Sequence, residues 1–543
     1  MTVSRRRRAP ATPASGSRRQ PTHGASRRRL AAYAAAWTAT LLLAGCALAP
    51  ALRDGDADVA ARPPATLEDR CERAYAALDR AVAAAGVGDA EAARVAGFPY
   101  LRVDRLLASL DPSPDDAPVF AAWVQQLATR DDDARRAEIA NLPADATARL
   151  RHEFAADGFE TLTPATLLAG CSTRLRERDL ATPSGRRRLL AAAVVPDDYD
   201  DALRALGAYP LTALPFAAGV RRYEAATHAA FALPLADLPL QGVLRHYQPR
   251  AAPTLSAAEV RAVLARARDN PLRLPLPDAA ESDALLATFA PLLVIDERDN
   301  DDRVGRPRYD EGDEVAIDTA APVLFTRIAH TRFGDELLLQ LVYTAWFPAR
   351  RATSPFDLLA GRLDALVWRV TLAGDGTPLL HDSIHACGCY HLLFPSPRLT
   401  PRPLPPTIDE GALAPQWLGP PVPGARIALR IESGTHYLRR VVVLPPSEHW
   451  PAPAAIAYGL APDDALRTLP RAAGGTRSLY APDGLVRGSE RGERFVFWPM
   501  GIASAGAMRQ WGRHATAFVG RRHFDEPRLI ERYFEPAAGS QPR

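Results

Sequence analysis

The hydrophobic pattern of this chain changes its period near Phe289, and that change limits the folds open to it. Before this point apolar side chains recur at helical spacing, and the runs end at proline or glycine nearly every time. After it, short apolar runs are separated by turns such as Gly374-Asp375-Gly376. A chain of 543 residues is too long for one core. The sequence therefore predicts an α+β protein, with an N-terminal all-α helical domain followed by a β-rich domain.

The same pattern gives the expected boundaries. The α-helical domain covers residues 66–285. The β-rich domain, a sandwich or a partial barrel, covers residues 286–500, and a C-terminal helical tail covers residues 501–543. Residues 1–45 and 46–65 read as a signal peptide and a flexible tether.

Charge and composition exclude several functions. The chain has no lysine, so all 66 of its basic residues are arginine. This excludes a Schiff-base lysine and the lysine of a nucleotide-binding phosphate loop. Nine arginines lie in residues 1–45, which hold no acidic residue, so the remainder has 57 arginines against 63 acidic residues. Such a mildly acidic body gives no electrostatic case for nucleic acid, and we expect neither a nucleic-acid nor a nucleotide partner.

The N-terminus carries the features of a secretory signal. Arg27-Arg28-Arg29 precede an apolar run of about 15 residues, which is short for a membrane span of ~20. Its end, Leu42-Leu43-Ala44-Gly45-Cys46, resembles the lipobox of bacterial lipoproteins. The resemblance implies cleavage before Cys46 and lipidation of this residue. It also implies a lipid anchor in the outer membrane facing the periplasm, because Ala47 stands where aspartate would favour the inner membrane.

Two alternatives remain for this segment. Residues 26–30 resemble a twin-arginine export signal, and the whole run could instead be one uncleaved anchor helix. In the body, Tyr343-Thr344-Ala345-Trp346-Phe347-Pro348-Ala349-Arg350 and Cys387-Gly388-Cys389-Tyr390 resemble uncharacterised predicted lipoproteins of Gram-negative bacteria. That resemblance adds to the case for export and implies no activity.

Export to an oxidising compartment would favour disulfide bonds between the cysteines. With Cys46 lipidated, four remain, and we favour a disulfide between Cys71 and Cys171 because both fall in the helical half. Cys387 and Cys389 are then a pair of thiols, a short-loop disulfide or metal ligands.

The segment at 381–391 is the richest in reactive groups. His381, His385, Cys387, Cys389 and His391 all carry odd numbers, so a single β-strand would point them to one face. A hairpin of residues 367–372 and 379–384 would place this strand beside Trp368 and Val370.

All five side chains cannot bind the same metal ion, because His381 and His385 are ~13 Å apart on a straight strand, so we expect a mononuclear site built from some of them. Its ligands would be Cys387 and Cys389 with His385 or His391, and His436 or His330 would come from elsewhere. Sulfur and imidazole ligands suit zinc or copper. The alternatives are a disulfide or redox pair, and buried cysteines with histidines in a polar cluster.

Two charged segments have two interpretations each. The acidic loop at 296–302 could bind calcium, or it is a solvated turn balanced by Arg303 and Arg306. The basic and aromatic segment at 509–523 could face anionic lipids, or it packs against the acidic body with salt bridges.

No catalytic motif stands out. Gly-x-Ser-x-Gly, His-Glu-x-x-His and a glycine-rich dinucleotide loop are all missing from the sequence. We therefore expect a lipid-anchored cell-envelope protein that acts as a binding or scaffold protein, anchored to the membrane and able to contact an envelope partner. The alternative is a metal-dependent hydrolase or metal-handling protein.

Overall fold

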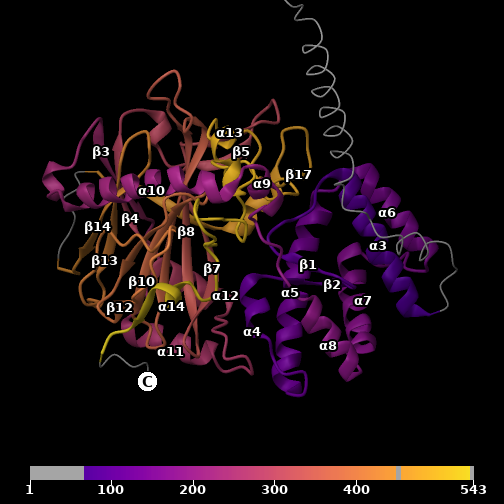
Figure 1. Cartoon of the computed structure of the whole chain (residues 1–543). Helices are drawn as coiled ribbons and strands as arrows, with labels where there is room; N and C mark the ends of the chain where they lie inside the picture. Colours follow the sequence, from indigo (N-terminus) through magenta and orange to yellow (C-terminus); the bar gives the residue numbers. More distant parts are fainter. Residues whose placement is uncertain (1–65, 448–453, 539–543) are drawn as a thin grey trace, which may run out of the picture. The chain divides into compact units, whose positions relative to one another are not determined.

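The computed structural model describes residues 66–447 and 454–538 (Figure 1). It is an α+β protein in which helices come first and a large curled sheet follows. The predicted signal peptide, the lipidated Cys46 and the tether lie outside the described residues.

The first part of the described chain is mostly helical, and its first helix, Leu67–Ala85, is capped at both ends. The Thr66 hydroxyl accepts the N–H of Asp69, and the Asp69 carboxylate accepts the N–H of Thr66, so both ends of a capping box are present. Gly86 then ends the helix in the left-handed region at φ 64°. The elements of this part are α3 (Leu67–Ala85), β1 (Ala93–Val95), β2 (Phe98–Val103), α4 (Arg105–Leu110), α5 (Ala117–Ala140), α6 (Ala144–Ala156), α7 (Pro164–Asp179) and α8 (Pro183–Ala192).

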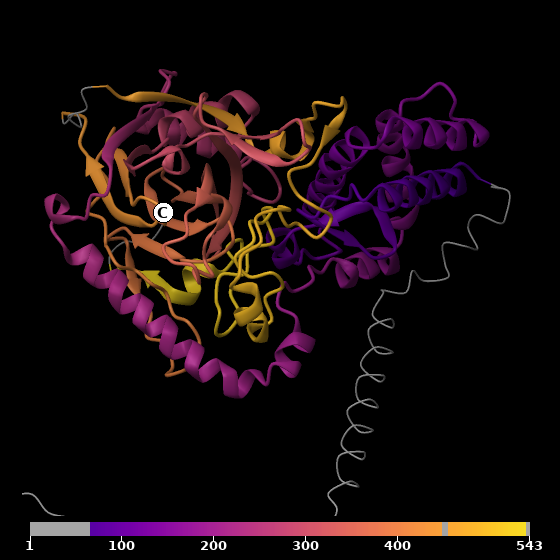
Figure 2. The same ribbon diagram turned by 90° about the horizontal axis from the view of Figure 1, so that it is seen from above.

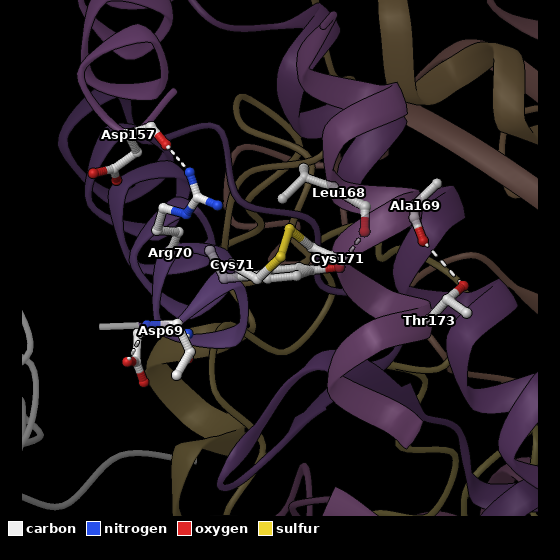
Figure 3. Close-up of a disulfide and its surroundings, with 10 residues drawn as sticks. Asp69, Arg70, Cys71, Asp157, Leu168, Ala169, Cys171 and Thr173 are labelled. Atoms are coloured by element: carbon white, nitrogen blue, oxygen red, sulfur yellow. Dashed lines mark hydrogen bonds between the residues drawn. A yellow bond between two sulfur atoms is a disulfide. The ribbon is translucent and has the colours of Figure 1, made fainter. Parts of the chain in front are cut away.

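A disulfide joins the first and the fifth of these helices (Figure 3). Cys71 on α3 and Cys171 on α7 are both buried in the core of this part, as the sequence favoured. The bond closes a loop with a sequence separation of 100 residues. Nearby, Arg70 donates to the Asp157 carbonyl at 3.2 Å, which ties α3 to the end of α6.

The segment predicted as all-α contains three strands. β1 and β2 form an antiparallel hairpin, and β3 (Val243–Pro249) pairs with β4 (Leu292–Glu297) of the large sheet. Hydrophobic periodicity does not predict β2, because its apolar run, Phe98-Pro99-Tyr100-Leu101, is too short. The remaining helices are α9 (Asp201–Leu206), α10 (Tyr209–Ala232), α11 (Ala257–Ala267) and α12 (Ala279–Thr288).

The large sheet has ten strands in the order β11-β10-β9-β8-β7-β15-β3-β4-β13-β14. β7 to β11 follow one another as an antiparallel meander, whereas β15 is parallel to both of its neighbours. Figure 2 shows the sheet curling on itself, and α10, the long magenta helix, running along its outside. The strands are β7 (Val323–Phe333), β8 (Glu336–Arg350), β9 (Gly361–Leu372), β10 (Pro378–His385), β11 (Leu392–Pro395), β13 (Arg426–Ile431), β14 (Leu438–Leu444) and β15 (Ile456–Pro462), with β3 and β4 as above.

Both faces of the central strands are buried, which explains their continuous apolar sequence. On β8, Leu341 and Tyr343 pack in a core with α11 and α12. Val342 and Trp346 pack in a second core with residues of the C-terminal segment. The expected hairpin is present, with Ser383 opposite Trp368 and His381 opposite Val370.

The C-terminal segment differs from the expected helical tail. Among the described residues of 478–538 it contains two short α-helices, α13 (Arg494–Phe497) and α14 (Leu529–Tyr533), the 3-10 helix η4 (Trp498–Met500) and the strand β18 (Phe534–Pro536). The rest of this range runs as loops held by backbone bonds to the body. Glycines with positive φ at 501, 506, 512 and 520 break any helical run. The small strand pairs are β5 (Arg306–Tyr309) with β6 (Val315–Asp318), β12 (Leu399–Pro401) with β18 (Phe534–Pro536), and β16 (Leu469–Pro470) with β17 (Thr476–Arg477).

Charged contacts join the helical part to segments that follow the sheet strands in sequence. Arg105 of α4 pairs with Asp525 at 3.0 Å, and Arg467 pairs with Asp89 at 2.8 Å. The described residues, 66–447 and 454–538, belong to one compact unit. Across the described ranges, we find no helix with the length and apolar character needed to cross a bilayer.

Candidate functional site

The segment expected as a single strand at 381–391 is instead the tip of a hairpin. β10 ends at His385, the chain turns back, and β11 pairs with β10 through Ser383 and Leu392. Gly388 at φ 94° makes the turn, and a Cβ there would overlap the carbonyl oxygen of Ala515. The prediction that five reactive side chains share one strand face is therefore wrong, because only residues up to 385 are extended.

Cys387 and Cys389 lie in this turn as buried free thiols. The two thiols are hydrogen bonded to each other, and this bond, together with burial, holds the pKa of Cys389 well above its ordinary value. Cys389 is therefore protonated at neutral pH, which makes it a poor nucleophile.

The histidines expected near the thiols have separate partners. His381 stacks on Trp368 with ring centroids 5.3 Å apart, and the Nε2 atom of His391 lies 3.0 Å from Asp382. His330 lies on β7 and contacts the Pro275 carbonyl at 2.7 Å. Burial lowers the pKa of His330, His381 and His391 to about 4, so all three are neutral.

His385 and His436 do meet, through the carboxylate of Asp364. The Nδ1 atom of His385 is 3.3 Å from one carboxylate oxygen and that of His436 is 2.8 Å from the other. Arg491 adds a contact at 3.3 Å. Burial would raise the pKa of Asp364, but the charge of Arg491 and the hydrogen bonds from His385 and His436 hold it well below its usual range.

The two imidazoles of this group differ in charge. Burial lowers the pKa of His385, so its ring is neutral at pH 7. Burial acts in the same direction on His436, but its bonds with Asp302 and Asp364 outweigh burial and raise its pKa. Asp364 is thus a fixed anion between a neutral and a readily protonated ring.

These positions do not make the metal site that the sequence suggested. Cys387, Cys389, His385, His391 and His436 are divided among the thiol pair, the Asp382 contact and the Asp364 contact. In the described parts of the chain, no three His, Cys, Asp or Glu side chains are grouped so that they could hold a metal ion. The donor set therefore does not fit zinc or copper.

The charged segments mostly use their charges within the protein. In the acidic loop, Glu297 pairs with Arg303 at 3.2 Å, and Asp299 and Asp301 pair with Arg351. In the basic segment, Arg513 pairs with Asp198 at 2.9 Å.

A cavity of about 440 Å³ lies beside the hairpin tip. One wall is α10, and the others come from the hairpin turn, the loop at 410–413, the residue before β14, α13 and the loop at 516–522. Most of its lining is apolar or aromatic. The side chains with rings are Pro215, Phe216, Tyr223, Tyr390, His391, Tyr437, Phe497 and Phe518.

The hairpin turn places Tyr390 in this cavity. Tyr390 and Tyr437 meet edge to face with ring centroids 4.6 Å apart, and Arg350 lies behind them, 5.1 Å from the Tyr437 ring. His385 is also in contact with the pair, 5.1 Å from the Tyr390 ring. A small cavity of about 10 Å³, which is the size of one water molecule, lies between His385 and these tyrosines. The Asp364 group therefore stands directly behind the wall of the large cavity.

Three carboxyl groups line the cavity. Glu410 accepts the N–H groups of Phe518 and Val519 at 2.6 and 3.0 Å and lies 3.5 Å from Arg522. Glu224 is half-buried on α10. Burial raises the pKa of Glu493 to about 7, against the lowering effect of Arg491 and Arg350.

Sequence reasoning found one edge of this site and missed the rest. The lining residues span positions 215 to 522 and come from segments that no local motif connects. The Cys-Gly-Cys-Tyr turn was singled out for its thiols, whereas its contribution to the cavity is Tyr390. A comparison with known protein families, with characterised proteins and with solved structures gave no match, so the function has to be inferred from this geometry.

Proposed function

We propose that this protein is a lipid-anchored protein of the cell envelope that binds a small, mostly apolar organic molecule in the cavity beneath α10. The observation that carries the proposal is the cavity itself, whose volume and aromatic lining are those of ligand pockets.

The hydrophobic effect favours filling such a cavity. Transfer of apolar surface from water into it contributes roughly 25 cal/mol per Å². Several of its rings are already packed against one another, as Phe497 and Phe518 are at 4.6 Å, so little side-chain freedom is lost on binding. Preformed walls therefore favour a binding role.

The location in the envelope rests on two features. The lipobox-like sequence that ends at Cys46 supports export and lipidation. The Cys71–Cys171 disulfide supports an oxidising compartment such as the periplasm. The metal-dependent hydrolase that the sequence left open lacks its ligand group in the described residues.

A dye titration tests the binding role. The neutral fluorophore N-phenyl-1-naphthylamine should bind the purified protein saturably, with one site per chain. A bulky side chain at Gly219, which faces open space on the cavity wall of α10, should weaken this binding at least tenfold. The matched control is Gly170→Trp on α7, where a Cβ also meets nothing within 4 Å and which is remote from the lining.

The comparison of the two variants is decisive. Binding that is lost in Gly219→Trp and kept in Gly170→Trp supports the proposal. Equal binding in both variants would place the dye on the surface and contradict it. Both substitutions replace a helical glycine, so neither removes a contact within the fold.

A further inference from the structure

Glu493 contributes a carboxyl group to the cavity wall and is more deeply buried than Glu224. Its side chain is buried at 4% exposure, and within the described residues it has no hydrogen bond and no ion pair. Gly506 makes room for it, because a Cβ at 506 would overlap the Glu493 carboxyl oxygen. A buried carboxyl without a partner is costly, so its position in a cavity wall indicates a partner that arrives from outside.

The nearby cations already have partners. Arg522 pairs with Glu410 and donates to the Gly411 carbonyl at 2.6 Å. Arg491 contacts Asp364 and donates to the Gly506 carbonyl at 3.1 Å. None of these arginines has a salt bridge to Glu493.

Arg350 is the second arginine whose charge acts on Glu493. Its guanidinium donates to the Tyr437 hydroxyl at 3.3 Å and lies over the rings of Tyr390 and Tyr437. It stands behind these rings and is not part of the cavity lining. Tyr390, Tyr437 and Glu493 therefore share the cavity wall, and the charge of Arg350 acts on Glu493 from outside this lining.

The aromatic walls complete the arrangement. Tyr390 and Tyr437 are in contact, Tyr223 packs on them at 5.3 and 6.3 Å, and Phe518 and Phe497 add a second stacked pair to the lining. The faces of such rings attract cations, and this attraction is stronger where water is excluded. A carboxylate beside several rings is the arrangement that recognises an organic ammonium group.

We infer that the ligand of this cavity is an organic cation, an apolar body with a protonated or quaternary nitrogen that lies against Glu493. This inference rests on the proposed binding function and names the chemical class of the ligand. A bound cation stabilises the ionised form of Glu493, since an opposite charge favours the charged form of a carboxyl.

The pH dependence of binding follows from this contact. Four charged groups act on Glu493: Arg491 and Arg350 favour its ionised form, and Asp364 and Asp357 oppose it. With the pKa of Glu493 at about 7, its ionised fraction rises severalfold between pH 6 and pH 8. Cation affinity should therefore increase by roughly fivefold over this range, and neutral ligands should not respond.

The experiment compares benzyltrimethylammonium with neopentylbenzene, which has the same shape without the charge. Each is titrated against bound N-phenyl-1-naphthylamine, and the cation is also titrated directly by calorimetry. The cation should bind at least tenfold more tightly than the neutral isostere. Glu493→Gln should reduce cation affinity by roughly tenfold and leave neopentylbenzene unchanged, and the exposed Glu160→Gln is the matched control.

The outcomes separate this inference from the proposed function. Equal affinities for the two probes, or a cation preference that survives in Glu493→Gln, would overturn the inference and leave the binding function standing. No binding of dye, cation or isostere would overturn the proposed function and the inference with it. If Glu493→Gln does not fold, the pH dependence in the unaltered protein decides, and a flat cation affinity from pH 6 to 8 contradicts the inference.

Discussion

Three residues near the cavity hold a backbone conformation that favours glycine. Leu363, Tyr390 and His436 have φ values of 59°, 62° and 52°. Each such residue costs about 1–2 kcal/mol relative to ordinary backbone. Leu363 precedes Asp364, His436 bonds to Asp364, and Tyr390 lines the cavity. Strained residues persist where surrounding contacts fix them, and here they aim the side chains that form the site.

The buried neutral histidines predict how stability depends on pH. The pKa of His381 is lowered to about 4 by burial, whereas in the unfolded chain it is about 6.5. Its contribution to stability is therefore complete above pH 6.5 and is lost as the pH falls toward 4, because the unfolded state binds the extra proton. Glu493 and Asp463 have raised pKa values, so their contributions to stability increase as the pH falls. The effect of His381 is therefore measured by comparing the unaltered protein with a variant changed at this residue alone.

We expect His381→Phe to flatten this pH dependence. His381 stacks on Trp368, and a phenyl ring preserves that contact. Between pH 6 and 4.5, the unaltered protein should lose about 1.4 kcal/mol of unfolding free energy per pH unit more than the variant. Urea denaturation at several pH values measures this, with the exposed His152→Phe as control. Parallel curves for the two proteins would show that His381 is not a buried neutral base.

The sequence predicted only some of the contacts between individual side chains. It favoured Cys71 with Cys171 because both lie in helices, and it marked His385, His391 and His436 as reactive. It could not show that Asp364 and Asp382 hold these rings, because Asp364 lies 72 positions from His436. Partners so distant in sequence are brought together by sheet register and not by any local pattern.

Among the elements, the β10–β11 hairpin determines the site. Its turn carries the thiols and Tyr390, and it is fixed to the C-terminal segment by the bond from the N–H of Arg509 to the Ala386 carbonyl at 2.8 Å. Cys387 and Cys389 fill space in the adjoining core. Their role is thus to pack the turn.

Gly388→Ala should destabilise the protein by about 3 kcal/mol. The left-handed conformation costs a Cβ-bearing residue ~1–2 kcal/mol, and the overlap with the Ala515 carbonyl adds to this. Gly434→Ala is the matched control, because Gly434 has φ 72° but a Cβ there meets nothing within 4 Å. Its cost should be about 1 kcal/mol. Equal midpoints of chemical denaturation for the two variants would mean that the turn is not packed as described.

The sequence predicted the type of the secondary-structure elements better than the residues at which they end. The change from helices to strands and the β9–β10 hairpin follow from hydrophobic period and turn residues. The turn at 386–391 was missed because all its side chains are compatible with a buried strand, and a single glycine is a weak signal for a reversal. The irregular C-terminal segment was missed because tertiary contacts hold it and not its own propensity.

For the whole molecule, the disulfide and the proposed lipid anchor together predict the number of free thiols. Denatured but unreduced mature protein should show two thiols, from Cys387 and Cys389, because Cys71 and Cys171 are bonded and Cys46 is lipidated in the proposal. Reduction should raise the count to four. It should also lower the unfolding free energy by about 4 kcal/mol, as expected for a closed loop of this length.

Each deviation in this count has a distinct meaning. Three thiols before reduction would leave Cys46 unmodified and contradict the lipid anchor. No thiols before reduction would mean that Cys387 and Cys389 are oxidised. A Cys387→Ser, Cys389→Ser double variant should lower the count by two and serves as the reference.

The cavity is a property of the whole chain, since residues from α10 to the C-terminal loop enclose it. No short sequence motif predicts a cavity formed by such distant segments. The sequence could therefore favour a binding function without locating the binding site. The most direct test is a crystal structure of the protein grown with N-phenyl-1-naphthylamine. Electron density for the dye should lie between α10 and the Tyr390–Tyr437 pair, within contact of Phe518. Dye bound elsewhere, with this space closed by side chains, would contradict it.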